Sequence, residues 1–156
     1  HELANTLRIS AETVREYTYL LRKSYIAAEI APFHSNVRKE LTKMPKLYML
    51  DNGFRNTILN DFRRIDERQD RGDALENQVF IAMRTQGVEP LFYWRTQDKK
   101  EVDFVVPDQY ALEVKWAFPQ FYPRRYKTFT ESYPDIPLTP VVFQDNVVPD
   151  VSDFLR

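Results

Sequence analysis

Two runs of alternating side chains, residues 101–106 and 110–116, constrain the fold of this 156-residue chain more than any other feature. Each run reads as a β-strand, and Pro107-Asp108 closes the first one. Successive side chains on a strand point to opposite faces, so each run divides into two sets. Both strands are therefore expected to have one apolar face and one face that also carries charged residues.

Asp103 and Glu113 lie on the charged faces of these two strands. Those faces carry Glu101, Asp103 and Val105 on the first strand and Ala111, Glu113 and Lys115 on the second. The opposite faces carry Val102, Phe104 and Val106, and Leu112, Val114 and Trp116. If the strands pair as an antiparallel meander, Asp103 and Glu113 meet across the ladder with roughly 5 Å between Cβ atoms. A slip of one residue in the register would instead scatter these residues over both faces.

The elements around this strand pair predict a layered α/β fold. The expected order is a helix at 73–86, strands at 91–96, 101–106 and 110–116, a helix at 123–133 and a strand at 139–144. Gly87 and Pro90 end the first of these helices. This order predicts an α/β (α+β) fold in which helices flank a mixed sheet.

The facing acids predict a metal site. Two carboxylates held close together repel each other unless a cation lies between them. A hard divalent ion such as Mg²⁺ or Mn²⁺ satisfies both, with water and substrate phosphate completing its shell. Lys115 projects about 7 Å beyond Glu113 on the same face, where it can orient the attacking water and offset negative charge. This arrangement is typical of metal-assisted phosphodiester hydrolysis, whereas an isolated Glu-x-Lys is more often a surface ion pair.

Glu76 adds a further acid from the first predicted helix of this unit. It shares a helix face with Val79, Phe80 and Met83, at spacings of three, four and seven residues. An acid in the first turn of such a face is either a boundary residue favoured by the helix dipole or a metal ligand. Both interpretations stay open.

The first 50 residues predict a small unit of their own. The expected elements are helices at 1–7 and 11–23 and strands at 25–32 and 48–50. Ser10 is a suitable N-cap for the second helix, and two helices joined by a tight turn form a helix-turn-helix. The segment between the strands carries Arg38, Lys39, Lys43 and Lys46 against a single acid, Glu40. A hairpin with a basic tip after a helix-turn-helix is a winged helix, which either contacts DNA or only packs against protein.

Residues 51–72 are expected to connect the two units. Asn52-Gly53 indicates a turn, and the run 61–73 alternates charges with almost no apolar periodicity. We therefore expect a surface linker here. The predicted domains are a winged helix-turn-helix at 1–60 and a nuclease-like domain at 61–156.

Composition excludes several classes of protein. Lys and Arg number 22 against 23 Asp and Glu, so a net charge of -1 argues against sequence-blind nucleic-acid binding through bulk charge. The absence of cysteine excludes disulfides and thiolate metal sites and fits a reducing, cytoplasmic location. No apolar run approaches the ~20 residues of a membrane span. Because the chain opens at His1 within a helical pattern, we expect it to be the C-terminal part of a longer protein.

Several segments together resemble the DUF4143 family. They are Lys46-Leu47-Tyr48-Met49-Leu50-Asp51-Asn52-Gly53-Phe54-Arg55-Asn56, Ala74-Leu75-Glu76-Asn77-Gln78-Val79-Phe80, Tyr93-Trp94-Arg95-Thr96, Glu101-Val102-Asp103-Phe104-Val105 and Ala111-Leu112-Glu113-Val114-Lys115. The resemblance implies an AAA+-type ATPase domain, then a winged helix, then a restriction-endonuclease-like domain of the PD-(D/E)XK type. ATP would bind only in the ATPase domain, because this chain has no Walker motif.

The resemblance also implies roles for individual residues. Glu76, Asp103, Glu113 and Lys115 correspond to the helix acid, the strand acid, the second acid and the lysine of the PD-(D/E)XK core. Val102 stands where that motif has proline, a substitution that the superfamily tolerates. In such folds the helix after the lysine strand borders the active site, so Arg124, Arg125 and Lys127 become candidate DNA contacts, or a solvated helix end.

These observations predict a Mg²⁺-dependent DNA nuclease. Asp103 and Glu113, with Glu76 as a third candidate, would hold the metal, and Lys115 would position the water. The expected partners are DNA, through Arg38, Lys39, Lys43 and the second basic cluster, and the chain's own N-terminal ATPase domain. We expect no membrane contact and leave oligomerisation open. The alternative is a nuclease fold without catalysis that binds DNA or protein and regulates the attached ATPase.

Overall fold

The computed structural model describes residues 2–33, 44–96, 98 and 100–143. Its α-helices are α1 (Glu2–Leu7), α2 (Ala11–Lys23), α4 (Asn52–Leu59), α5 (Arg71–Thr85) and α6 (Lys127–Ser132). Its strands are β1 (Ala27–Pro32), β2 (Lys46–Met49), β3 (Phe92–Arg95), β4 (Glu101–Val106), β5 (Tyr110–Lys115) and β6 (Leu138–Val142). Short 3₁₀ turns occupy Ile65–Glu67, Phe118–Gln120 and Pro123–Tyr126. These elements confirm the helices and strands expected between 73 and 143, with shifts of one or two residues at most of their ends, and α6 begins four residues later than expected, after the 3₁₀ turn at Pro123–Tyr126.

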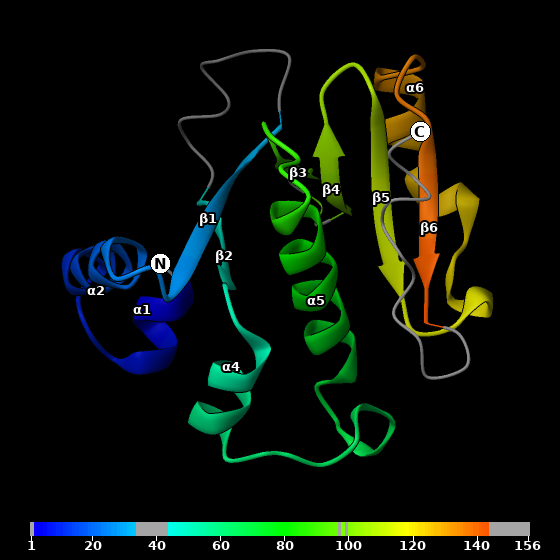
Figure 1. The fold of residues 1–156 in the computed structure, drawn as a ribbon. Helices are drawn as coiled ribbons and strands as arrows, with labels where there is room; N and C mark the ends of the chain where they lie inside the picture. The colour runs from blue at the N-terminus through cyan, green and yellow to red at the C-terminus, as the bar shows by residue number, and fades with distance from the viewer. Residues whose placement is uncertain (1, 34–43, 97, 99, 144–156) are drawn as a thin grey trace.

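The described strands form one mixed sheet in the order β2-β1-β3-β4-β5-β6 (Figure 1). Neighbouring strands run antiparallel except for β1 with β3 and β5 with β6, which are parallel. The predicted α/β class with a mixed sheet is therefore confirmed. None of the helices in the described ranges has both the length and the apolar character needed to cross a membrane.

The N-terminal helices and strands occur where the sequence predicts them, but the hairpin is not a separate wing. Ser10 caps α2 by accepting a hydrogen bond from the backbone of Thr13 at 3.0 Å. β1 continues the main sheet by pairing with β3, and the N–H of Phe33 donates to the carbonyl of Tyr93 at 2.6 Å. β1 is thus paired on both sides, with β2 and β3, whereas β2 remains an edge strand. One sheet spans both parts of the chain, and the division into domains at residues 60 and 61 stays a prediction.

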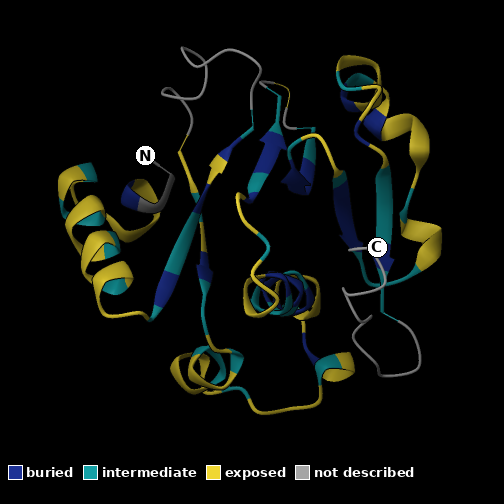
Figure 2. Ribbon diagram, turned by 45° about the horizontal axis from the view of Figure 1, so that its top comes forward, coloured by how far each residue is buried: buried dark blue, intermediate teal, exposed yellow. Residues whose placement is uncertain are grey.

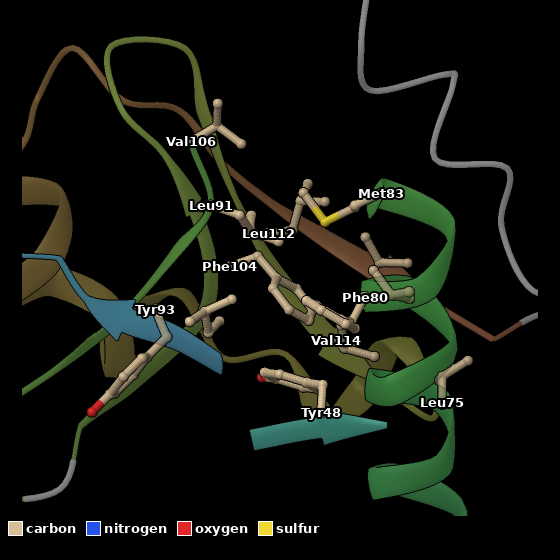
Figure 3. Close-up of a cluster of buried hydrophobic side chains, with 13 residues drawn as sticks. Tyr48, Leu75, Phe80, Met83, Leu91, Tyr93, Phe104, Val106, Leu112 and Val114 are labelled. Carbon is tan, nitrogen blue, oxygen red and sulfur yellow. The ribbon is translucent and has the colours of Figure 1, made fainter. Parts of the chain in front are cut away.

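Helices α5 and α6 pack on opposite faces of this sheet (Figure 2). The face under α5 holds the larger core, which Figure 3 shows around Phe80, Phe104 and Leu112. The rings of Tyr48 and Phe80 stack in it with centroids 4.5 Å apart. The other face holds a second core, composed of Trp94, Val102, Val105, Ala111, Tyr126, Phe129 and Ile136. Apolar burial on both faces explains why β4 and β5 are buried along nearly their whole length.

Strand β4 departs from simple alternation at Asp103. Trp94 pairs with Val102 and Phe92 pairs with Val105, so β4 contributes one residue more than β3 between these pairs. The prediction that Val102 and Phe104 share a face is therefore wrong, because they pack in different cores. An extra residue of this kind is a β-bulge, which bends a strand and re-aims its side chains.

The connector is more ordered than its composition predicts. Residues 52–59 form helix α4 instead of a turn, and Asp51 caps it by accepting from the N–H of Phe54 at 2.6 Å. The run 61–73 is not a plain surface linker, because the side chain of Arg68 is only 3% exposed. Polar side chains can order a segment through hydrogen bonds that leave no apolar periodicity.

Candidate metal and catalytic site

The bulge places Asp103 at the edge of the paired region of β4 and β5. Backbone pairing runs from Val106 with Tyr110 to Phe104 with Leu112. Beyond it, the Oδ2 atom of Asp103 accepts a hydrogen bond from the N–H of Val114 at 2.8 Å. The carboxylate thus joins the two strands at this point, and the residue is only 7% exposed. This contact places the Asp103 carboxylate beside the backbone of Val114, the residue after Glu113.

Glu113 is buried on β5, and one of its carboxylate oxygens has no hydrogen-bond partner among the described residues. Its Oε1 atom accepts a hydrogen bond from the hydroxyl of Tyr126 at 2.8 Å and forms an ion pair with Lys115. Its Oε2 atom is buried, and no partner for it exists among the described residues. Buried carboxylate oxygens are normally satisfied by donors or bound to metal ions. Glu113 Oε2 is therefore a buried acceptor for which the described residues supply no donor.

Lys115 links Glu113 to a neighbouring cavity. Its Nζ atom donates to the carbonyl of Val114 at 3.0 Å as well as to Glu113. An ammonium group has three donors, so one more can reach a water or a phosphate oxygen. A cavity of about 340 Å³ opens beside it. Its lining includes Glu76, Asp103, Lys115 and Trp116 but not Glu113, so Lys115 lies between the cavity and part of that carboxylate.

Glu76 joins the same site from α5, but a lysine already binds it. Its Oε1 atom accepts hydrogen bonds from Lys46 Nζ at 2.9 Å and from the hydroxyl of Tyr48 at 2.6 Å. Lys46 Nζ also forms an ion pair with Glu101 and lies 3.6 Å from Asp103 Oδ1. Glu76, Asp103 and Lys115 thus line one cavity, and Glu113 adjoins it through its ion pair with Lys115.

The sequence prediction misses Lys46, Tyr48, Glu101 and Tyr126 as members of this site. It assigns Lys46 to the basic loop between the first two strands. Alternation along β2 is a signal that could have been used, because Lys46 and Tyr48 are two residues apart and share a face. Nothing in the sequence indicates which distant acids that face meets.

The electrostatics of the site follow from burial and crowding. Burial raises the pKa of Asp103 well above its usual value, and the charges of Glu76 and Glu113 raise it further. Burial also raises the pKa of Glu113, although Lys115 and Tyr126 act in the opposite direction. Burial alone would lower the pKa of Lys46, but the carboxylates of Glu76, Asp103 and Glu101 outweigh it, so that pKa is raised. The site therefore resists negative charge and retains positive charge.

The side chains of the site supply only a few of the ligands that a metal ion needs. Among the described residues, no group of three or more His, Cys, Asp or Glu side chains has an arrangement that could hold one. Mg²⁺ commonly needs only one or two carboxylates, with water and phosphate as its other ligands. Asp103 and Glu113, with the free Oε2 atom, fit that smaller requirement.

The predicted nucleic-acid contacts fall in two places. Arg38, Lys39 and Lys43 lie outside the described residues. Arg124, Arg125 and Lys127 are exposed around the start of α6, and Lys127 lies 3.5 Å from Glu131. Tyr126, in the middle of this cluster, is buried and bonds to Glu113. The exposed cations are therefore attached to the turn that supports a site carboxylate.

A larger cavity of about 700 Å³ lies away from this site, between α2, β1 and the C-terminal end of α5. None of the four predicted catalytic residues lines it. This cavity is therefore not part of the site at Asp103 and Glu113.

Comparison with known proteins gives relatives of undetermined activity. Two are named only as uncharacterised proteins, one from Mycobacterium bovis and one from Mycobacterium tuberculosis. Each is 31% identical over 120 residues, which cover 73% of this chain and 27% of the relative. The chain thus spans about a quarter of the length of these relatives. No solved structure matches it.

Two family models match consecutive parts of the chain. Residues 1–65 match a domain of unknown function, DUF8612, and this match includes the segment 46–56 that the sequence resemblance assigns to DUF4143. Residues 71–149 match the domain of unknown function DUF4143, and this match contains all four predicted catalytic residues. The second match covers just over half of the chain, and the chain belongs to the DUF4143 family.

Proposed function

We propose that this chain is a metal-dependent nuclease domain that hydrolyses phosphodiester bonds at Asp103 and Glu113. The observation that carries the proposal is the buried Oε2 atom of Glu113, which lacks a partner in the described structure and lies in a crowded group of carboxylates. A divalent cation bound there would relieve the repulsion between the acids and polarise a phosphate oxygen and a water molecule.

The protein's own residues supply the remaining roles. Asp103 and Glu113 bind the ion, and the Val114 N–H and the Tyr126 hydroxyl fix the orientation of their carboxylates. Lys115 Nζ donates to the attacking water or to a phosphate oxygen, where it offsets the negative charge that develops during attack. The oxygen of the water would bond to phosphorus and the water would lose one proton, while the bond to the leaving sugar oxygen breaks and that oxygen takes up one proton.

The cation-rich turn at Arg124, Arg125 and Lys127 is the proposed contact for the nucleic-acid backbone. The chain has a net charge of -1, so binding needs a local cluster of cations. The cluster flanks Tyr126, which contacts Glu113, and therefore lies near the reacting phosphate in the proposed complex. DNA is the proposed substrate, and the proposed full-length protein couples this domain to an AAA+-type ATPase.

Plasmid nicking in the presence of Mg²⁺ tests this function. Asp103→Asn, Glu113→Gln and Lys115→Met are each expected to lower the nicking rate by about 100-fold or more, because each removes charge stabilisation at the reaction centre. Glu131→Gln is the matched control, since Glu131 is an exposed acid on α6. Chelation of divalent ions is expected to abolish nicking, and unchanged nicking by Asp103→Asn would exclude the proposed site.

One observation favours a second function, a nuclease fold that binds without cleaving. Lys46 already neutralises part of the acidic group, so the fold does not depend on a metal for all its charge balance. In that case, DNA binding would be sensitive to salt but independent of divalent ions. The nicking assay separates the two functions directly.

A further inference from the structure

Lys46 holds a cation inside the acidic site. Its Nζ atom lies 2.9 Å from Glu76 Oε1 and 3.6 Å from Asp103 Oδ1, and it also pairs with Glu101. The side chain is 23% exposed and passes the ring of Tyr93 at 5.6 Å from its centroid. Three carboxylates from two elements, α5 and β4, therefore converge on one ammonium group.

The backbone fixes this lysine in place. Lys46 is the first residue of β2 and pairs with Ile30 of β1. Tyr48, two residues further along the same strand face, donates to the same oxygen of Glu76. Lys46 and Tyr48 therefore hold Glu76 Oε1 toward β2 by two hydrogen bonds.

The lysines divide the acids into two groups. Lys46 contacts Glu76, Glu101 and Asp103, whereas Lys115 contacts Glu113. Asp103 borders both groups, because its Oδ1 atom faces Lys46 and its Oδ2 atom binds the backbone of β5. Lys46 thus fills the position among Glu76, Glu101 and Asp103, whereas Lys115 lies beside Glu113, whose Oε2 atom has no partner among the described residues.

The charge balance favours a single additional ion. With all four carboxylates ionised, their formal charge would be -4, and Lys46, Lys115 and Arg95, which pairs with Glu101, contribute +3. Arg71 and Asp73, which also line the cavity, cancel each other. One divalent ion would change the total from -1 to +1, which matches the single negative charge of a phosphodiester. A second would leave a charge of +3 in a largely buried site, which is costly.

We propose that Lys46 is a resident cation that occupies the position of a second divalent ion and so limits this site to one bound metal. The proposal rests on the proposed function for the identity of the one remaining metal position. It adds that the protein performs with one metal and one lysine what two metal ions do in a paired-metal site.

Counting bound Mn²⁺ tests the role of Lys46. The electron paramagnetic resonance signal of free Mn²⁺ gives the number of ions bound per chain, with no need for activity. Lys46→Met removes the charge with little change in length, and Lys46→Gln keeps a donor for Glu76 if the first variant does not fold. Lys46→Arg keeps the charge, and Lys23→Met is a matched control on exposed α2.

The expected result is one more Mn²⁺ per chain in the two neutral variants of Lys46 than in the wild type. Lys46→Arg and Lys23→Met are expected to bind the wild-type number. Equal binding by the wild type and a folded neutral variant would overturn the proposal, as would two ions in the wild type.

The same counts of bound Mn²⁺ also test the proposed function, independently of the role of Lys46. One ion in the wild type that disappears in Glu113→Gln supports the proposed metal position, whatever the neutral variants show. No ion in the wild type but one in Lys46→Met would remove the proposed metal position and still support Lys46 as the resident cation.

Discussion

Val114 and Asp103 are joined by a hydrogen bond of 2.8 Å from the backbone N–H of the first to the carboxylate of the second. This contact lies just beyond the end of the backbone pairing between β4 and β5, next to the β4 bulge. It gives Asp103 a structural role in addition to its proposed binding of metal.

Two substitutions at Asp103 separate these roles. Asp103→Ala leaves the buried Val114 N–H without an acceptor, whereas Asp103→Asn keeps an oxygen in the same place. Asp103→Ala is therefore expected to be less stable than Asp103→Asn by about 1–3 kcal/mol, although both variants lack the negative charge. Urea unfolding of the two variants without metal measures the difference, and equal free energies of unfolding would show that the bond does not contribute.

The contribution of Asp103 and Glu113 to the stability of the metal-free protein should fall as pH rises above about 4. Burial raises the pKa of Asp103 and that of Glu113, so the folded state binds protons more tightly than the unfolded chain. Stability then decreases as pH rises from the unfolded pKa of about 4 toward the higher folded values.

Thermal unfolding between pH 4 and 8 compares the wild type with Asp103→Asn. The wild-type melting temperature is expected to fall more steeply with pH, because the variant lacks the buried acid. Asp70 has a lowered pKa because of Arg68 and acts in the opposite direction, but it is present in both proteins and cancels. The same slope of melting temperature against pH in both proteins would mean that ionisation of Asp103 does not destabilise the folded state.

Arg68 should be essential to the connector. It donates to Asp70 at 2.8 Å, to Asn56 at 2.5 Å and to the carbonyl of Asp61 at 3.0 Å while almost fully buried. Arg68→Met removes these donors, although Arg55 still pairs with Asp70 at 2.7 Å, and is expected to cost about 3 kcal/mol in the free energy of unfolding.

Arg63→Met is the matched control for Arg68. Arg63 also pairs with Asp61, but its side chain is 58% exposed. A surface pair contributes about 0–1 kcal/mol, so this variant should remain close to the wild type in urea unfolding. Similar destabilisation of both variants would contradict a special role for Arg68.

The exposed cations near α6 should control the salt dependence of DNA binding. Replacing Arg124, Arg125 and Lys127 by Gln removes three candidate phosphate contacts. The slope of log K against log salt is expected to become less steep by about 0.9 for each phosphate that the variant no longer neutralises. Fluorescence anisotropy with duplex DNA measures the slope, and an unchanged slope would place the DNA-binding surface elsewhere. Arg64→Gln, in the connector, is the control.

The sequence predicts the C-terminal elements well because their signals are local. Alternation and turn residues indicate β4 and β5, and they bring Asp103, Glu113 and Lys115 together. The bulge at Asp103 cannot be predicted from alternation, because it depends on how β4 matches β3 in the sheet. Even so, the expected proximity of Asp103 to the second strand holds, since the bulge lies on the side toward β3.

The contacts made between distant segments could not be predicted in this way. Lys46 reaches Glu76, Glu101 and Asp103 only because β2 and β1 join the sheet beside β3. A parallel pairing such as that of β1 with β3 leaves no turn signal in the sequence. Arg68 could not be predicted either. Its burial depends on polar partners, which produce no periodic pattern of apolar residues in the sequence.

The most direct test of the central claim is a calorimetric titration of Mn²⁺ into the wild type and into Glu113→Gln. The account predicts a saturable heat of binding for the wild type that is abolished in the variant, because Glu113 Oε2 is the proposed metal ligand. No binding heat in the wild type, or the same heat in both proteins, would contradict a metal site at Asp103 and Glu113.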